Sequence, residues 1–302
     1  MVTDGIVTVI IVSHDSEAVI AGALDSLPGE CPVICVDNDS HDRSCEIVSR
    51  YPARLLRRTN IGFGRACNLA AEEATTEFLL FLNPDVRLAA NAVDRLTDAA
   101  RRYGGDAVFA PLVEDATGQT QFRDTSRIER WHEPGRPVRA APVGDCCTGF
   151  VDGSVFLVRR DTFLGVGGFD PNIFLYYEDD DLSWRLRLAR IPMIHVNTAR
   201  ATHLLSNSSP ATASNLMFRA RARKISEYYV RTKYDRRTRP LLDGLHQLVN
   251  TLWYAATFNR PRLLAAIGRL AGVAEVLTSP EALQTGRPVP DGRRDATLVP
   301  GE

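Results

Sequence analysis

The chain has 302 residues, of which 44% are hydrophobic and 24% charged, and its formal net charge at pH 7 is −1. This length predicts one main domain with an appendage, and the composition allows a sizeable apolar core. A net charge so close to zero argues against a protein that simply coats nucleic acid. The six cysteines lack the C-x-x-C spacing of a zinc site, and residues 1–5 contain no basic leader. We therefore expect a cytoplasmic protein with reduced thiols and no cleaved signal peptide.

Strands and helices alternate over the first part of the chain. Apolar runs predict strands at residues 7–12, 33–36, 53–56 and 78–82, and helical spacing predicts helices at 18–27, 45–50 and 62–74. Short connections of this kind are typical of a mostly parallel sheet with helices on both faces. Polar residues follow each strand at its carboxyl end, so the sequence predicts an α/β fold with a ligand site at that edge.

The middle of the chain is less regular. A helix is expected at residues 91–103 and strands at 107–111 and 149–159. Residues 114–145 are polar, rich in Arg, Pro and Gly, and without clear periodicity. A long loop in a compact domain is often a lid or an acceptor-binding segment, and we expect that role here.

The composition changes near Ser206. Residues 219–239 contain nine Lys and Arg against two acidic residues, with aromatic residues between them, and two apolar stretches follow at 241–258 and 263–277. Neither apolar stretch has the roughly 18 to 20 uninterrupted residues of a spanning helix. No nucleic-acid-binding motif accompanies the cations, and a basic interfacial helix fits an anionic membrane surface better.

These changes predict three parts of the chain. We expect a catalytic domain at residues 1–209, a basic and apolar helical region at 210–278, and a disordered tail at 279–302, where Pro, Gly and charged residues dominate.

Two acidic motifs carry the chemical argument. Asp85, in Asn83-Pro84-Asp85, follows a buried strand, and Mg²⁺ or Mn²⁺ is usually held by one or two carboxylates together with substrate phosphates. A Pro turn with Asp as a helix cap would have the same sequence. Residues 178–181 place four carboxylates at the start of a predicted helix, more than the helix dipole requires. Mutual repulsion should raise the pKa of at least one of these carboxyl groups, and we therefore expect one of them to act as a general base.

A histidine and a glycine-containing run are weaker candidates. His203 fits a metal ligand, a diphosphate contact or a structural residue, and His195 competes with it for any such role. The run at residues 60–68 contains two glycines but lacks both the G-x-G-x-x-G spacing and a Walker Lys-Ser/Thr, so its glycines also fit close helix packing.

Read in order, six segments resemble family 2 glycosyltransferases with the GT-A fold, particularly their bacterial rhamnosyltransferase-like branch. The segments are residues 9–12, 36–40, 60–63, 83–86, 158–160 with 167–170, and 177–182. The resemblance covers roughly residues 6–210 and implies a sheet flanked by helices, plus a C-terminal helical appendage.

The resemblance also implies roles for individual residues. The residues expected to bind the donor are Asp37, Asp39, Asn60, Gly62, Asn68, Asp85 and Arg185, with Arg185 alternatively ordering the acidic loop. Asp85 would carry the metal, Mg²⁺ or Mn²⁺, although Asn83 stands where relatives often have a second acidic residue. His203 lies where relatives often have His-x-x-Gly-x-Ser, but Ser206 replaces the glycine.

The implied reaction is an inverting transfer. Asp179, in the Glu178-Asp179 pair, would remove the acceptor hydroxyl's proton while that oxygen attacks the anomeric carbon opposite the leaving diphosphate. The expected donor is a nucleoside-diphosphate sugar, with dTDP-rhamnose implied by the branch alone. The expected acceptor is a glycan or a polyprenyl-diphosphate-linked glycan at the inner face of the plasma membrane.

Three other readings of the sequence stay open. A sugar-phosphate nucleotidyltransferase would need a glycine-rich basic loop near the N-terminus, which residues 13–16 do not provide. A processive polysaccharide synthase would need a Q-x-x-R-W element and spanning helices. A non-catalytic nucleotide-sugar-binding relative would have lost catalytic carboxylates, yet Asp85 and Asp179 are both present.

Overall fold

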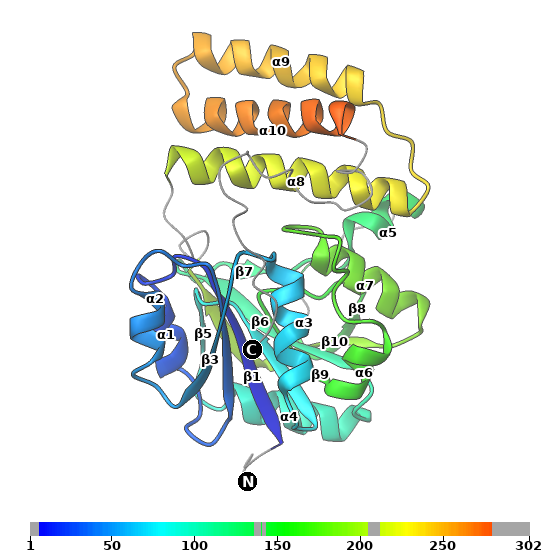
Figure 1. Cartoon of the computed structure of the whole chain (residues 1–302). Helices are drawn as coiled ribbons and strands as arrows, with labels where there is room; N and C mark the ends of the chain where they lie inside the picture. Colours follow the sequence, from blue (N-terminus) through cyan, green and yellow to red (C-terminus); the bar gives the residue numbers. More distant parts are fainter. Residues whose placement is uncertain (1–5, 136–139, 141–142, 205–211, 280–302) are drawn as a thin grey trace. The chain divides into compact units, whose positions relative to one another are not determined.

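The chain divides into two compact units (Figure 1). The computed structural model describes residues 6–135, 140, 143–204 and 212–279. The first unit consists of Met1–Pro171 and Tyr177–Ala211, and the second consists of Asn172–Tyr176 and Thr212–Glu302. The expected tail, from residue 280 onward, lies outside the described residues.

A ten-stranded sheet forms the centre of the first unit, in the order β3-β2-β1-β4-β9-β6-β10-β5, with β7 on β6 and β8 on β10. Its strands are β1 (Val7–Ser13), β2 (Val33–Asn38), β3 (Ala53–Arg58), β4 (Phe78–Leu82), β5 (Val86–Leu88), β6 (Val108–Asp115), β7 (Thr120–Gln121), β8 (Cys146–Thr148), β9 (Val155–Arg159) and β10 (Met193–His203). Strands β1 to β4, β6 and β10 run in one direction, and the others pair with them antiparallel. The predicted α/β sheet is confirmed, and it is mixed: parallel pairing joins β1, β2, β3 and β4 and joins β6 to β10, whereas the other pairings are antiparallel.

Helices cover both faces of this sheet. They are α1 (Ile20–Asp25), α2 (Ser44–Val48), α3 (Phe63–Glu73), α4 (Ala92–Tyr103), α5 (Arg127–His132), α6 (Arg160–Gly165) and α7 (Glu178–Leu188). Successive residues of a strand point to opposite faces, so every residue of β1 is buried between two apolar clusters. Val9 and Ile11 join the cluster with α1 and α4, whereas Ile10 and Val12 join the cluster with α3 and α7.

The expected loop at 114–145 contains regular structure. Strand β6 continues to Asp115, and β7 and α5 follow it. These elements are two and six residues long, too short for periodicity to identify them. The strand expected from residue 149 instead begins at Val155. The Asp152 side chain accepts a hydrogen bond from the Ser154 amide (2.8 Å), and this local turn replaces the first part of the strand.

The second unit is a three-helix arrangement of α8 (Ala213–Lys233), α9 (Pro240–Ala256) and α10 (Arg260–Thr278), in which α10 packs against both others (Figure 1). Two glycines of α10 allow the close approach to α8. A Cβ atom at Gly268 would lie 2.3 Å from the Met217 carbonyl oxygen, and one at Gly272 would lie 2.9 Å from that of Arg221. Among the described helices, none combines the length and apolar character needed to cross a bilayer.

Candidate active site

The carboxyl ends of β1 and β2 bring two of the predicted donor residues together. Asp37 is the penultimate residue of β2 and only 5% exposed, and it accepts hydrogen bonds from the Ser13 hydroxyl (3.2 Å) and the Ser40 amide (3.3 Å). Asp39 is exposed and has a φ of 73°, in the left-handed region that Asp tolerates better than most residues. Hydrogen bonds therefore hold the Asp37 carboxylate in place, whereas the Asp39 side chain is exposed at the end of β2.

Asn60 and Gly62 lie beside the same edge. The Asn38 amide group donates to the Asn60 side-chain oxygen (3.0 Å), and the Ile61 backbone amide donates to the Asn38 side-chain oxygen (2.9 Å). Gly62 has a φ of 89° and leads into α3. A glycine at this φ costs no steric strain, so the chain can turn from β3 into the helix close to β2.

Asp85 and His203 meet because β5 and β10 pair antiparallel. His203 is opposite Val86 in the register, and its Nε2 atom lies 3.4 Å from Oδ1 of Asp85. Asp85 is 2% exposed, and among the described residues its Oδ1 and that of Asn83 are buried without a hydrogen-bond partner. Burial alone would lower the pKa of His203, but the neighbouring Asp85 carboxylate outweighs burial and raises that pKa above its ordinary value.

This pair fits a divalent cation that takes most of its ligands from a substrate. No group of three or more His, Cys, Asp or Glu in the described part of the chain is arranged to hold a metal on its own. Mg²⁺ typically needs only one or two carboxylates when phosphate oxygens are present. The unsatisfied oxygen of Asp85 is such a donor, and the neutral form of His203 could add a nitrogen.

His195 differs from His203 in its surroundings and in the direction in which its pKa is shifted. It lies within β10 and is 4% exposed, and its ring meets that of Phe122 edge-on at 5.2 Å. Burial lowers the pKa of His195, although Asp145 partly opposes this. Of the two histidines, His203 is therefore the one beside the predicted metal carboxylate.

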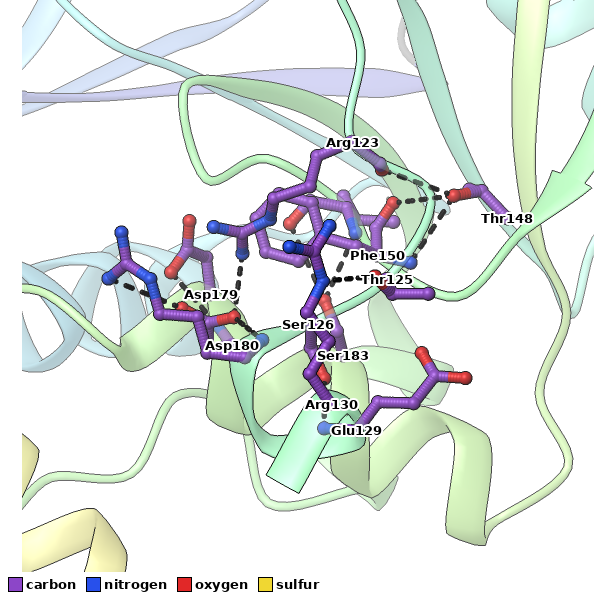
Figure 2. Close-up of polar contacts among 12 residues, drawn as sticks. Arg123, Thr125, Ser126, Glu129, Arg130, Thr148, Phe150, Asp179, Asp180 and Ser183 are labelled. Atoms are coloured by element: carbon purple, nitrogen blue, oxygen red, sulfur yellow. Dashed lines mark hydrogen bonds and ion pairs between the residues drawn. The ribbon is translucent and has the colours of Figure 1, made fainter. Parts of the chain in front are cut away.

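The four carboxylates at the start of α7 differ in their hydrogen-bond and ion-pair partners. Asp181 is fully buried and pairs with Arg185 (2.7 Å). Asp180 is 1% exposed and accepts hydrogen bonds from the Arg123 guanidinium and the Arg127 backbone amide, both at 2.6 Å (Figure 2). Asp179 is partly exposed and has no cation partner at hydrogen-bond distance among the described residues, so it is the carboxylate of this helix turn that a substrate hydroxyl can reach.

Burial, together with neighbouring negative charges, raises the pKa values of Glu178, Asp179 and Asp180. Burial, followed by the charge of Asp180, raises the pKa of Asp179 to about 7, although Arg123 opposes the shift. Burial and the charge of Asp179 raise the pKa of Glu178 to about 8. A carboxylate that titrates near neutral pH suits general base catalysis, because it is a stronger base than an ordinary carboxylate.

Sequence reasoning missed two charged residues of this site. The Arg123 guanidinium lies over the Phe150 ring, 3.3 Å from its centre, and points toward Asp179 and Asp180 (Figure 2). It comes from the segment without periodicity, so nothing in the sequence marked it. The negative charge of Asp152 raises the pKa of both His203 and Asp179, so Asp152 lies near both acidic motifs. Its Asp-Gly dipeptide is a turn signal that could have identified it.

Two predicted donor residues instead hold the protein together. The Asn68 amide group donates to the Phe169 carbonyl (2.8 Å), and its oxygen accepts from the Phe169 amide (2.9 Å). Arg185 donates to Asp181 and to the carbonyls of Val166 and Gly168, each at 2.7 Å. Of the two roles expected of Arg185, these contacts match the ordering of the acidic loop.

Gly153 provides a test of how closely Asp179 is positioned. A Cβ atom at Gly153 would lie 3.3 Å from Cβ of Asp179, whereas one at Gly29 would meet nothing within 4 Å. We expect Gly153→Ala to displace Asp179 slightly and to lower kcat by about tenfold, since 1 Å of misplacement can cost about 100-fold. Steady-state kinetics would check this against Gly29→Ala. An unchanged kcat in Gly153→Ala would show that the position of Asp179 is not critical.

Known proteins share both the sequence and the fold of this chain. The family model for glycosyl transferase family 2 matches residues 8–165. An N-acetylglucosaminyl-diphospho-decaprenol L-rhamnosyltransferase of Mycobacterium tuberculosis is 32% identical in an alignment 217 residues long, which covers 61% of this chain and 70% of the relative.

Solved structures resemble the chain over most of its length. S. aureus TarS 1-349 superposes with a TM-score of 0.55 at 14% identity, covering 93% of this chain and 92% of TarS 1-349. The mannosyltransferase PcManGT of Pyrobaculum calidifontis, solved with GDP-Man and Mn²⁺, superposes with a TM-score of 0.53 at 15% identity, covering 93% and 72%. At this identity the likeness concerns the fold, and the expected GT-A architecture is confirmed.

Proposed function

The chain belongs to glycosyl transferase family 2, and from this we propose that it is an inverting rhamnosyltransferase acting on a lipid-linked glycan. One observation carries the mechanistic part of the proposal. Of the four carboxylates that begin α7, Asp179 is the one that is partly exposed, lacks a cation partner at hydrogen-bond distance and has a pKa of about 7.

The donor is held at the carboxyl ends of β1, β2 and β4. We assign Asp37 and Asp39 to the base and ribose, because they stand at the sheet edge where α/β folds bind nucleotides. Asn60 and Gly62 form the adjoining wall of the pocket. Asn68 and Arg185 act on the donor indirectly, by ordering the turn at Gly168 and Phe169 and the start of α7.

Asp85 and His203 would hold the divalent cation, Mg²⁺ or Mn²⁺, that the transfer needs. Their contact, the unsatisfied Asp85 oxygen and the Mn²⁺ in the structure of the similar mannosyltransferase support this assignment. When bound, the cation neutralises charge on the leaving nucleoside diphosphate. Because a proton on His203 would compete with the cation, binding should weaken as pH falls.

Asp179 accepts the proton of the acceptor hydroxyl as that oxygen attacks the anomeric carbon. The bond to the diphosphate breaks on the opposite face, so configuration inverts in a single displacement that needs one base. Arg123 holds Asp180 and leaves Asp179 free to face the acceptor. Burial and the charge of Asp179 raise the pKa of Glu178, which favours the protonated form of Glu178 when Asp179 is ionised.

The acceptor is an amino sugar on a prenyl diphosphate. The similar M. tuberculosis enzyme is named for N-acetylglucosaminyl-diphospho-decaprenol, and this chain aligns with 70% of that enzyme. A substrate of this kind is anchored in a bilayer by its prenyl chain, so the protein works as a peripheral protein at the inner face of the membrane.

A donor panel tests the proposal directly. The purified chain is offered dTDP-, UDP- and GDP-sugars with Mn²⁺, with Mg²⁺ or with EDTA, and released nucleotide and transfer to a short-chain prenyl-diphosphate N-acetylglucosamine are measured. We expect cation-dependent turnover of dTDP-rhamnose above all other donors. Turnover of another donor alone would refute rhamnose, and failure to bind any donor would reduce the proposal to a shared fold.

A further inference from the structure

Helix α9 carries an apolar stripe on its outer face. Its members are the large apolar residues that recur at helical spacing and remain 44 to 75% exposed: Leu241, Leu242, Leu245, Leu248, Val249, Leu252 and Trp253. Residues at spacings of 3, 4, 7, 8, 11 and 12 share one face of an α-helix. Contiguous exposed apolar surface of this extent marks an interaction site in a soluble protein.

Gln247 and Asp243 of α9 make their contacts inside the second unit, whereas His246 is exposed. Gln247 is 6% exposed and exchanges hydrogen bonds with Asp243 (3.3 Å) and Arg269 (2.8 Å). Asp243, the only acidic residue of the helix, accepts hydrogen bonds from Lys224 (2.9 Å) and Tyr228 (2.7 Å) of α8. The second unit therefore stabilises α9 through its polar side, and the outer stripe carries no charge.

Arginines stand at both ends of the stripe. Arg237 and Arg239 precede α9, Arg260 and Arg262 follow it, and all four are exposed. The acidic residues close to these ends are Asp235 and Asp243, and Asp243 is paired with Lys224. An uncharged face bounded by cations complements a surface with anionic groups outside and hydrocarbon beneath.

Three of the six cations of α8 are less suited to that task than the sequence suggested. Arg221 pairs with Glu275 (2.6 Å), Lys224 pairs with Asp243 (2.9 Å), and Arg231 pairs with Glu227 (3.0 Å). These three cations are paired with carboxylates of the second unit. The surface available to a membrane is thus α9 with its flanking arginines.

We propose that α9 lies in the surface of an anionic membrane, with its leucines and Trp253 at the boundary between headgroups and acyl chains. This inference rests on the proposed lipid-linked acceptor and names the element that brings the chain to it. A second copy of the chain is disfavoured as the occupant. Whether two α9 helices paired parallel or antiparallel, arginine-bearing ends would lie together and repel each other.

Vesicle co-sedimentation of the full chain tests the proposal without donor or acceptor. Wild type is mixed with phosphatidylcholine vesicles containing 30% or no phosphatidylglycerol, and is compared with L245Q/L252Q and R237Q/R239Q/R260Q/R262Q. We expect both variants to bind the anionic vesicles at least tenfold more weakly than wild type. Leu188→Gln, an exposed leucine of α7, is the matched control and should bind like wild type.

Two further readouts separate the possible outcomes. Donor hydrolysis in vesicle-free solution should be the same in both variants as in wild type, so a failure of membrane binding is distinguishable from a failure of the proposed transfer. Equal vesicle binding by wild type and L245Q/L252Q, with matching circular dichroism, would overturn the proposal. So would a wild-type dimer in light scattering that L245Q/L252Q converts to a monomer, because the stripe would then bind a second copy.

Discussion

Replacing Asp179 with Asn is expected to lower kcat for transfer by about 10²–10⁴-fold, the usual contribution of a general base, with little change in donor affinity. Asn has the same shape but cannot accept the hydroxyl proton. In the part of the chain that the structure describes, Asp179 has no cation partner at hydrogen-bond distance, so the substitution breaks no ion pair there and should leave the fold intact. Single-turnover transfer and calorimetric donor binding would measure the two effects separately.

The pH dependence identifies the base independently. Asp179 must be ionised to act, so kcat/KM should fall as pH drops below its raised pKa of about 7. With the cation kept saturating, the residual rate of Asp179→Asn should lose this dependence, while the exposed surface variant Asp161→Asn should keep the wild-type profile. If Asp179→Asn retains most activity and Glu178→Gln loses it, the base is Glu178.

Replacing Asp85 with Asn should abolish the effect of the cation. We expect kcat/KM to fall by roughly 10³-fold, because a bound cation contributes several kcal/mol of charge stabilisation. Asp85 is buried and, among the described residues, its Oδ1 has no hydrogen-bond partner and only the His203 contact at 3.4 Å, so removing its charge should cost the protein no more than that contact. Calorimetry with dTDP in Mn²⁺ and in EDTA would measure the loss.

Control variants distinguish a loss of cation binding from general damage to the protein. His203→Gln should weaken cation dependence less than Asp85→Asn does, because the carboxylate supplies the charge. Asp161→Asn should leave it unchanged. Binding of dTDP that is equally strong with Mn²⁺ and with EDTA in wild type would contradict the cation site, and so would full cation dependence in Asp85→Asn.

The fold was predictable where the sequence pattern is strong. Strand β4 is a run of five apolar residues followed by Asn-Pro, and such runs predict buried strands by composition alone. Short elements inside residues 114–145 were not predictable, because a two-residue strand has no period. The order of β9 between β4 and β6 is a long-range pairing that local pattern does not encode.

The site was predictable where motifs follow strands. Asp37, Asp85 and Asp179 lie at the sheet edge or at a helix start, as the sequence indicated. The side-chain partners were not predictable. Only the folded chain shows that Asp180 and Asp181 are paired with arginines while Asp179 is not, and that Asn68 binds the Phe169 backbone.

The configuration of the transferred sugar tests the central claim most directly. Purified chain, cation, dTDP-rhamnose and a short-chain prenyl-diphosphate N-acetylglucosamine are incubated, and the new glycosidic linkage is assigned by NMR. A single displacement with Asp179 as base predicts that the anomeric configuration is the inverse of the donor's. A product with the donor's configuration would require a second displacement or a different mechanism, and would contradict this account.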